Sequence, residues 1–326
     1  LGTVRDPKGG TVPVAKVTVR NNATAITATT LTDANGDYTF PSLQIGNYRL
    51  TVAKEGFTTA VAETVNLTVN GRQRVDFNLQ VGTVNETINV VESTALLESE
   101  SSSRGQVIQS RQITELPVLS RNYSQFALLT PGVRESQSGN QGSVAFRREG
   151  AYNVNGLRSV FNNFILDGLD NNAYGTSNQG FSNQVVQPSP DAVQEFRVET
   201  SNYSAEFGRA GGAIVNVSVK SGSNQYHGAV YEFLRNTSLN ATGFIKPVQN
   251  QKPVLIQNQY GAAFGGPIRK DKAFFFADFE GYRRVEKNIM FATIPTMDQR
   301  NGIFSTTVQN PYTGAIYSPG QLPSAE

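Results

Sequence analysis

The sequence has no cysteine, no tryptophan and a single histidine, His227, among its 326 residues. Without cysteine the chain can form neither a disulfide framework nor a thiolate metal site, and thiol redox chemistry is excluded. One histidine leaves no combination of nucleophile, base and orienting group of the kind that enzymes place in an active site. The sequence therefore predicts no catalytic residue, no metal site and no cofactor.

Long hydrophobic runs are also absent, and neither sign of charge dominates. No stretch of about 18 apolar residues occurs, so a transmembrane helix is excluded, whereas a membrane β-strand needs only about ten alternating residues. The net charge is +2, and lysine and arginine are scattered rather than gathered in a stripe. Nucleic acid is therefore not an expected partner.

Glycine, asparagine, serine and threonine are abundant between short alternating segments, a pattern typical of a mostly β protein with many turns. A length of 326 residues allows two or three domains. Shifts in composition divide the chain into a first domain over 1–80, a linker over 81–104, a mixed α and β domain over 105–222, and long strands over 223–326.

The first domain contains short strands separated by Gly, Pro, Asn or Asp, which indicates a small sandwich. Asn35-Gly36 predicts a type I′ hairpin, because that turn favours positive φ at both central residues. Asp33, Asn35 and Asp37 imitate the start of a calcium loop. The glycine and the glutamate that such a loop needs later are replaced, so a turn is the better interpretation.

A set of glycine, aromatic and aliphatic positions runs through this domain: Thr32, Asp33, Gly36, Tyr38, Phe40, Leu43, Gly46, Tyr48, Leu50, Val52, Gly56 and Phe57. The pattern resembles the carboxypeptidase regulatory-like domain, which is a prealbumin-like β-sandwich. The resemblance implies a non-catalytic module of the kind that often precedes an outer-membrane plug.

Residues 195–224 indicate a strand, a compact turn and a second strand. Phe196 and Val198 alternate with polar residues, and 214–219 is rich in β-branched side chains. The glycines between the strands permit positive φ or close backbone approach. Spacing alone fits an ordinary glycine-rich turn. No phosphate-binding loop is indicated, because a strand rather than a helix follows.

A tyrosine and glycine turn in this segment leads through a Gly-Gly pair into a strand that ends in Lys-Ser-Gly. The positions are Tyr203, Glu206, Phe207, Gly208, Gly211, Gly212, Val217, Lys220, Ser221 and Gly222. Upstream, 164–171 is a strand followed by an Asp167-Gly168 turn. The two segments, in this order, resemble the plug domain of TonB-dependent outer-membrane receptors and imply an α+β plug over 105–222. Asp167 and Asp170 lie in turn sequences, which favours a structural role over an acid–base pair.

The linker is acidic and rich in serine, and it has too few large apolar residues to bury a core. Within it lies a short β-prone stretch: Glu86, Thr87, Ile88, Asn89, Val90 and Val91. The stretch resembles the TonB box, which implies binding to a TonB-type periplasmic energy-coupling protein by strand addition. The alternative is that it forms the last strand of the first domain.

From residue 223 the sequence alternates over long strands, with a short turn at 269–272 and a longer polar segment at 236–257, as in an outer-membrane barrel. A soluble sandwich has the same period. The segment 265–281 resembles the first barrel hairpin of the Oar-like branch of these receptors. His227 is then a strand residue. One apolar strip is expected to group five side chains: Ala229, Tyr231, Phe233, Phe275 and Phe279.

Together the resemblances imply a mainly β chain with a prealbumin-like β-sandwich, a coupling segment, an α+β plug domain and the first strands of an incomplete transmembrane β-barrel. The chain is expected to be incomplete at both ends. The implied location is the bacterial outer membrane, in contact with its lipid. The implied function is energised uptake of an unidentified ligand, with no bond broken in it. The alternative is a structural or adhesive outer-membrane protein. An enzyme is a third hypothesis, which only a measured hydrolase activity would support.

Overall fold

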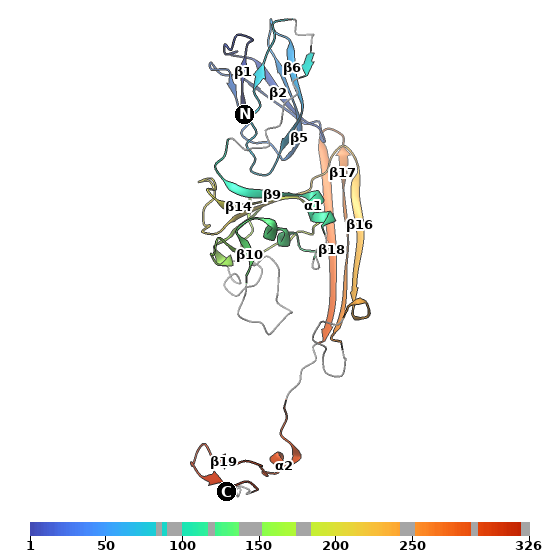
Figure 1. The fold of residues 1–326 in the computed structure, drawn as a ribbon. Helices are drawn as coiled ribbons and strands as arrows, with labels where there is room; N and C mark the ends of the chain where they lie inside the picture. Colours follow the sequence, from blue (N-terminus) through green and yellow to red (C-terminus); the bar gives the residue numbers. More distant parts are fainter. Residues whose placement is uncertain are drawn as a thin grey trace. The chain divides into compact units, whose positions relative to one another are not determined.

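The computed structural model is mainly β, and it describes residues 1–82, 87–89, 100–116, 121–136, 152–173, 184–241, 252–287 and 293–320. For 87–89 only the backbone is described. The chain forms two compact units (Figure 1), which are Leu1–Glu232 with Gln259–Gly281, and Phe233–Asn258 with Tyr282–Glu326. Within the described ranges, no helix has the length and apolar character needed to cross a membrane.

Two sheets form the first part of the chain, called the module below, whose strands are mostly blue in Figure 1. The larger sheet has the order β3-β2-β5-β6-β8, with β2 Lys16–Asn21, β3 Thr27–Leu31, β5 Gly46–Ala53, β6 Thr59–Leu67 and β8 Thr87–Asn89. The smaller sheet has the order β4-β1-β7, with β1 Gly2–Arg5, β4 Asp37–Tyr38 and β7 Phe77–Asn78. Every second residue of β5 is buried, so the period of two turns one face of the larger sheet onto the core.

The predicted hairpin at Asn35-Gly36 is wrong. Gly36 alone of this pair has a positive φ, at 76°. The Asp33 carboxylate accepts the backbone N–H groups of Asn35 at 2.8 Å and Asp37 at 2.9 Å, which fixes a different turn. The strands on either side of it, β3 and β4, belong to different sheets, because β4 pairs with β1 from the start of the chain. A long-range pairing thus overrides the local turn signal.

A five-stranded sheet, called the central sheet below, follows with the order β13-β12-β15-β14-β9. Its strands are β9 Arg104–Gln109, β12 Asn163–Leu166, β13 Leu169–Asp170, β14 Val193–Ser201 and β15 Ile214–Val219. The elements between them are α1 Ser110–Glu115, the 3-10 helices η1 Tyr123–Leu129 and η3 Ser159–Phe161, and the antiparallel pair of β10 Val133–Glu135 with β11 Tyr152–Val154.

One face of the central sheet carries its hydrophobic core. Phe196 and Val198 of β14 and Phe164 of β12 are fully buried in it, together with Ile113 of α1. Tyr123 of η1 packs edge-on against Phe196, with the ring centroids 5.3 Å apart. This core shares no residue with the core of the module. Each part therefore has a hydrophobic cluster of its own.

Three long strands form the sheet β16-β17-β18, with β16 His227–Asn236, β17 Val254–Arg269 and β18 Ala273–Lys287. The predicted grouping of their apolar side chains is wrong. The Tyr231 hydroxyl donates to Glu280 Oε2 at 2.9 Å, so these two side chains share one face. The neighbouring Phe279 points to the opposite face, where it is 62% exposed. The expected strip therefore mixed the two faces of the sheet.

The second compact unit also contains short elements: η5 Thr237–Leu239, α2 Met297–Arg300 and the antiparallel strands β19 Val308–Gln309 and β20 Ile316–Tyr317. Helix α2 begins with a capping box. Thr296 accepts the backbone N–H of Gln299 at 3.2 Å, and the side chain of Gln299 accepts the backbone N–H of Thr296 at 2.9 Å.

Candidate functional site

The predicted coupling segment contains strand β8 at the edge of the module. Thr87, Ile88 and Asn89 pair in parallel with Thr59, Ala60 and Val61 of β6. Glu86, Val90 and Val91 lie outside the described residues. Strand β8 is the last strand of the larger sheet on this side within the described residues, so its outer edge carries backbone groups that a further strand can pair with.

The aspartate of the Asp167-Gly168 turn hydrogen-bonds the upstream half of the plug motif to its second half. Asp167 and Gly168 have φ values of 47° and 82°, as a two-residue type I′ turn requires, and they connect β12 to β13. Asp167 Oδ1 accepts the backbone N–H of Val219 at 2.9 Å, so the upstream half of the motif is bonded to the end of β15. Asp170 Oδ1 accepts the backbone N–H of Asn172 at 2.9 Å, which is turn chemistry.

Tyr203 and the Gly-Gly pair shape the turn between β14 and β15. The Tyr203 hydroxyl donates to the carbonyl of Ala210, which closes the loop before the glycines. The N–H groups of Gly211 and Gly212 both donate to the carbonyl of Phe161, each at 3.0 Å. A Cβ at Gly212 would lie 2.3 Å from Asn162 Oδ1, so the position has no room for a side chain.

The other two glycines of the motif differ sharply from each other. A Cβ at Gly208 would meet nothing within 4 Å, so steric space does not require glycine there. A Cβ at Gly222 would lie 2.3 Å from the carbonyl oxygen of Phe275 and 2.7 Å from that of Gly266. Gly222 thus allows the chain to pass directly over the backbone of β17 and β18.

Lys220, near the end of the motif, lies among carboxylates. Its backbone N–H donates to the carbonyl of Ala192 at 2.8 Å. Burial lowers the pKa of the Lys220 ammonium, and the nearby carboxylates of Asp191 and Asp278 oppose that effect. The side chain is therefore a half-buried cation beside two acids.

Sequence reasoning did not find the polar contacts between this domain and the long strands. Arg121 forms an ion pair with Asp191 at 2.5 Å, and its guanidinium carbon lies 4.4 Å from the centre of the Tyr231 ring. Ser189 Oγ donates to Asp278 Oδ1 at 2.9 Å. The sequence indicates these contacts only through polar residues within the alternating strands. Sequence spacing does not show which face of a strand meets another domain.

Comparison with known proteins finds a family match at each end of the chain and one relative that aligns with most of its length. Residues 1–80 match the family described as "Carboxypeptidase regulatory-like domain", and residues 218–325 match "Outer membrane beta barrel domain". The TonB-dependent transporter Oar of Myxococcus xanthus is 30% identical over 296 residues, which are 86% of this chain and 26% of that protein. The chain is a homologue of the TonB-dependent transporter Oar. Its location is the outer membrane.

The receptor chain spans about a quarter of the length of its relative Oar. A chitinase, ChiA of Flavobacterium johnsoniae, is 35% identical over 89 residues, which are 27% of this chain and 5% of that protein. The solved siderophore receptor PirA of Acinetobacter baumannii is 20% identical, with a TM-score of 0.41 over 54% of this chain and 24% of that chain.

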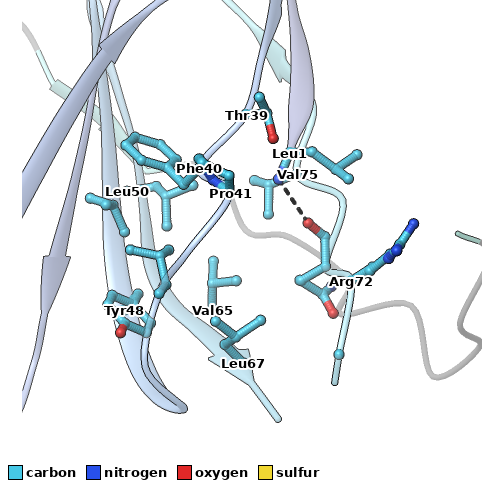
Figure 2. Close-up of a pocket in the computed structure, with 14 residues that line it drawn as sticks. Leu1, Thr39, Phe40, Pro41, Tyr48, Leu50, Val65, Leu67, Arg72 and Val75 are labelled. Atoms are coloured by element: carbon cyan, nitrogen blue, oxygen red, sulfur yellow. Dashed lines mark hydrogen bonds between the residues drawn. The ribbon is translucent and has the colours of Figure 1, made fainter. Parts of the chain in front are cut away.

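The module of the receptor also contains a pocket of about 350 Å³ (Figure 2). Polar and apolar atoms line it in equal measure, and Phe40, Tyr48, Leu50 and Val65 are among its apolar residues. Arg72 is the one charged side chain that lines it, and Figure 2 shows its guanidinium extending away from the apolar group. Among the described residues that line it there is no carboxylate and no imidazole, so the pocket does not indicate acid–base chemistry.

Proposed function

We propose that the receptor takes up a ligand across the outer membrane when a TonB-type periplasmic protein pulls on residues 86–91. The observation that supports this most strongly is the 30% identity to a TonB-dependent transporter over 86% of the chain. The ligand is captured outside the cell and passes through the barrel as the plug moves. It leaves unchanged, because this is transport rather than catalysis.

Strand β8 gives the coupling step a physical form. Within the described residues three residue pairs join it to β6, so along this stretch the cost of separating it from the module is small compared with the cost of unfolding a long strand. No further strand pairs with its outer edge among the described residues, so this edge can offer N–H and C=O groups to strand addition. A partner strand can therefore pair with β8 first and then pull it away from the module.

The contacts between the plug and the long strands are compatible with movement. Two of them involve charged and hydroxyl groups: the Arg121 guanidinium lies over the Tyr231 ring, and Ser189 donates to Asp278. Groups of this kind exchange their partners for water when they separate, so the penalty of breaking each contact is modest. A purely apolar seam of the same size would resist the entry of water.

The test compares Ile88→Pro with Ile88→Ala in the full receptor. Proline removes a main-chain donor and fixes φ, so we expect it to weaken binding of the purified periplasmic domain of a TonB-type protein by about tenfold or more. Alanine keeps the backbone intact and should change the dissociation constant by less than about threefold. Titration calorimetry measures both constants.

The outcome separates three cases. A loss confined to the proline variant supports strand addition at β8. Equal losses in both variants would indicate recognition of the Ile88 side chain instead. Unchanged binding in both variants would remove the coupling role from this segment.

A further inference from the structure

The face of the central sheet opposite its hydrophobic core is polar, yet it is buried. Glu195, Arg197 and Glu199 alternate along β14 and are 7%, 3% and 3% exposed, and Asn216 of β15, which pairs with Arg197, is 7% exposed. Arg197 Nε lies 2.8 Å from Glu199 Oε1. Charged side chains are seldom this buried unless another part of the protein covers them and supplies partners.

A turn of the module covers part of this face, at Glu195 and Asn216, while Arg197 donates to Ser103 Oγ at 3.1 Å. Residues 68–71 follow strand β6, and the N–H of Val69 donates to the Glu195 carboxylate. Asn216 Nδ2 donates to Asn70 Oδ1 at 2.9 Å. Asn70 has a left-handed φ of 53°, which places its side chain at the tip of the turn, and Val69 is itself only 6% exposed. The module therefore supplies hydrogen-bond partners to two neighbouring strands of the central sheet.

A second turn of the module makes a separate contact. The carbonyl of Ala23 accepts the backbone N–H of Asn224, just before β16, at 2.9 Å. The Asn224 side chain in turn donates to Asp271 Oδ1 at 2.7 Å, in the turn between β17 and β18. Strand register places both module turns at the same end of its larger sheet, because Asn21 pairs with Tyr48 and Gly46 pairs with Leu67.

These contacts are hydrogen bonds in which backbone and amide N–H groups donate to carbonyl, amide and carboxylate oxygens, and an exposed ion pair of Arg72 with Glu206 at 3.9 Å adds to them. The two hydrophobic clusters on either side of the contact share no residue. Polar contacts between domains that have separate cores resemble transient rather than obligate interfaces. We propose that the module is a releasable cap on the polar face of the central sheet, and that Glu195 is the residue that holds the cap in place.

Glu195 can hold the cap closed because its carboxylate accepts the backbone N–H of Val69 in the module. The donor is a backbone N–H, which becomes a buried unsatisfied group if the carboxylate is removed while the cap stays closed. When the cap opens, water satisfies both the N–H and the carboxylate. Burial also raises the pKa of Glu195, against the opposing effects of the Val69 hydrogen bond and Arg197. The closed state thus gains a hydrogen bond and incurs a desolvation cost, which keeps opening accessible.

These 326 residues contain no cysteine, which allows a direct test with introduced cysteine pairs. We expect the double variant Asn70→Cys with Asn216→Cys to be cross-linked by a short thiol-reactive linker in the full receptor, since the two native side chains touch. The matched control is Asn35→Cys with Asn216→Cys. Asn35 is exposed on the turn after β3, at the opposite end of the module. The first pair should react at least about tenfold faster.

Two substitutions at Glu195, each added to the Asn70→Cys and Asn216→Cys double variant, then test the latch itself. Glu195→Ala removes the acceptor and should slow cross-linking by about tenfold, whereas Glu195→Gln keeps an acceptor oxygen and should react at or above the rate of the double variant. The glutamine variant also shows that the protein tolerates a change at this position. No ligand and no coupling protein is needed, so the result is independent of the proposed uptake.

Each result decides something. If the first pair reacts no faster than the control pair, the module is not docked on the central sheet and the proposal is overturned. If Glu195→Ala leaves the rate unchanged, or Glu195→Gln slows it as much as alanine does, the Val69 hydrogen bond does not hold the cap. Slow reaction in the alanine variant alone supports the proposal.

Discussion

The module should fold by itself, and one pair of leucines tests whether its own core stabilises it. Leu79 follows β7 and is fully buried among module residues, whereas Leu31 at the end of β3 is 57% exposed. Both can be changed to alanine in a fragment of residues 1–82, so the chemical change is identical and only the burial differs. All residues of the module's hydrophobic cluster lie within this fragment.

The expected magnitudes follow from burial. Leu79→Ala removes a fully buried side chain and leaves a cavity, which costs about 2–5 kcal/mol of unfolding free energy. A domain of this size has a total stability of roughly 4–12 kcal/mol. For a domain of 60–100 residues each kcal/mol shifts the melting temperature by roughly 4–8 °C, so a fall of at least about 8 °C is expected. Leu31→Ala should stay within about 0.5 kcal/mol of the parent.

Thermal melts followed by far-ultraviolet circular dichroism measure both variants. We expect a cooperative β-type transition for the parent fragment, a large downward shift for Leu79→Ala and almost none for Leu31→Ala. A parent fragment without a cooperative transition would show that the module depends on the rest of the chain. Equal shifts for the two leucine variants would refute the assignment of the core.

Two further predictions concern the plug motif and the cap. Gly212→Ala should lower the melting temperature of the receptor, because its Cβ would approach Asn162 Oδ1 to 2.3 Å, whereas Gly208→Ala meets nothing within 4 Å and should be neutral; equal shifts would contradict the motif geometry. Burial raises the pKa of Glu195 above its ordinary 4.5 when the cap is closed, against the opposing Val69 hydrogen bond and Arg197. Protonation therefore favours closure. The test compares two cross-linking rates in the double variant with Asn70→Cys and Asn216→Cys, one with Glu195 intact and one with Glu195→Gln. The first rate divided by the second should fall as the pH rises from 4.5 through the raised pKa of Glu195. A rate ratio that does not change with pH would contradict the prediction that protonation of Glu195 favours closure.

Local turn chemistry predicted some of the site and failed where the pairing was long-range. The Asp167-Gly168 turn forms between adjacent strands, so sequence and structure agree there. Asn35-Gly36 is an equally strong hairpin signal, but no hairpin forms because β4 pairs with β1 in a different sheet from β3. A two-residue pattern contains no information about such a distant partner.

Alternation in a strand shows which residues share a face, but it does not show what that face meets. Tyr231 and Phe279 were grouped by apolarity across two strands, and the register of the sheet separates them. In the sequence Glu195 has the pattern of an ordinary polar residue in an alternating strand. Its burial depends on the turn of the module at Val69, 126 residues earlier in the chain, which no local pattern contains.

The central claim is that a TonB-type protein engages the receptor at β8, and in-cell photo-cross-linking tests it most directly. A photoreactive amino acid replaces Ile88 in β8, and as a control it replaces Leu31 in β3, the opposite edge strand of the same sheet. We expect an adduct with the TonB-type protein from position 88 alone, lost when that protein is deleted. No adduct at position 88, or equal adducts at both positions, would contradict the claim and favour a structural role in the outer membrane.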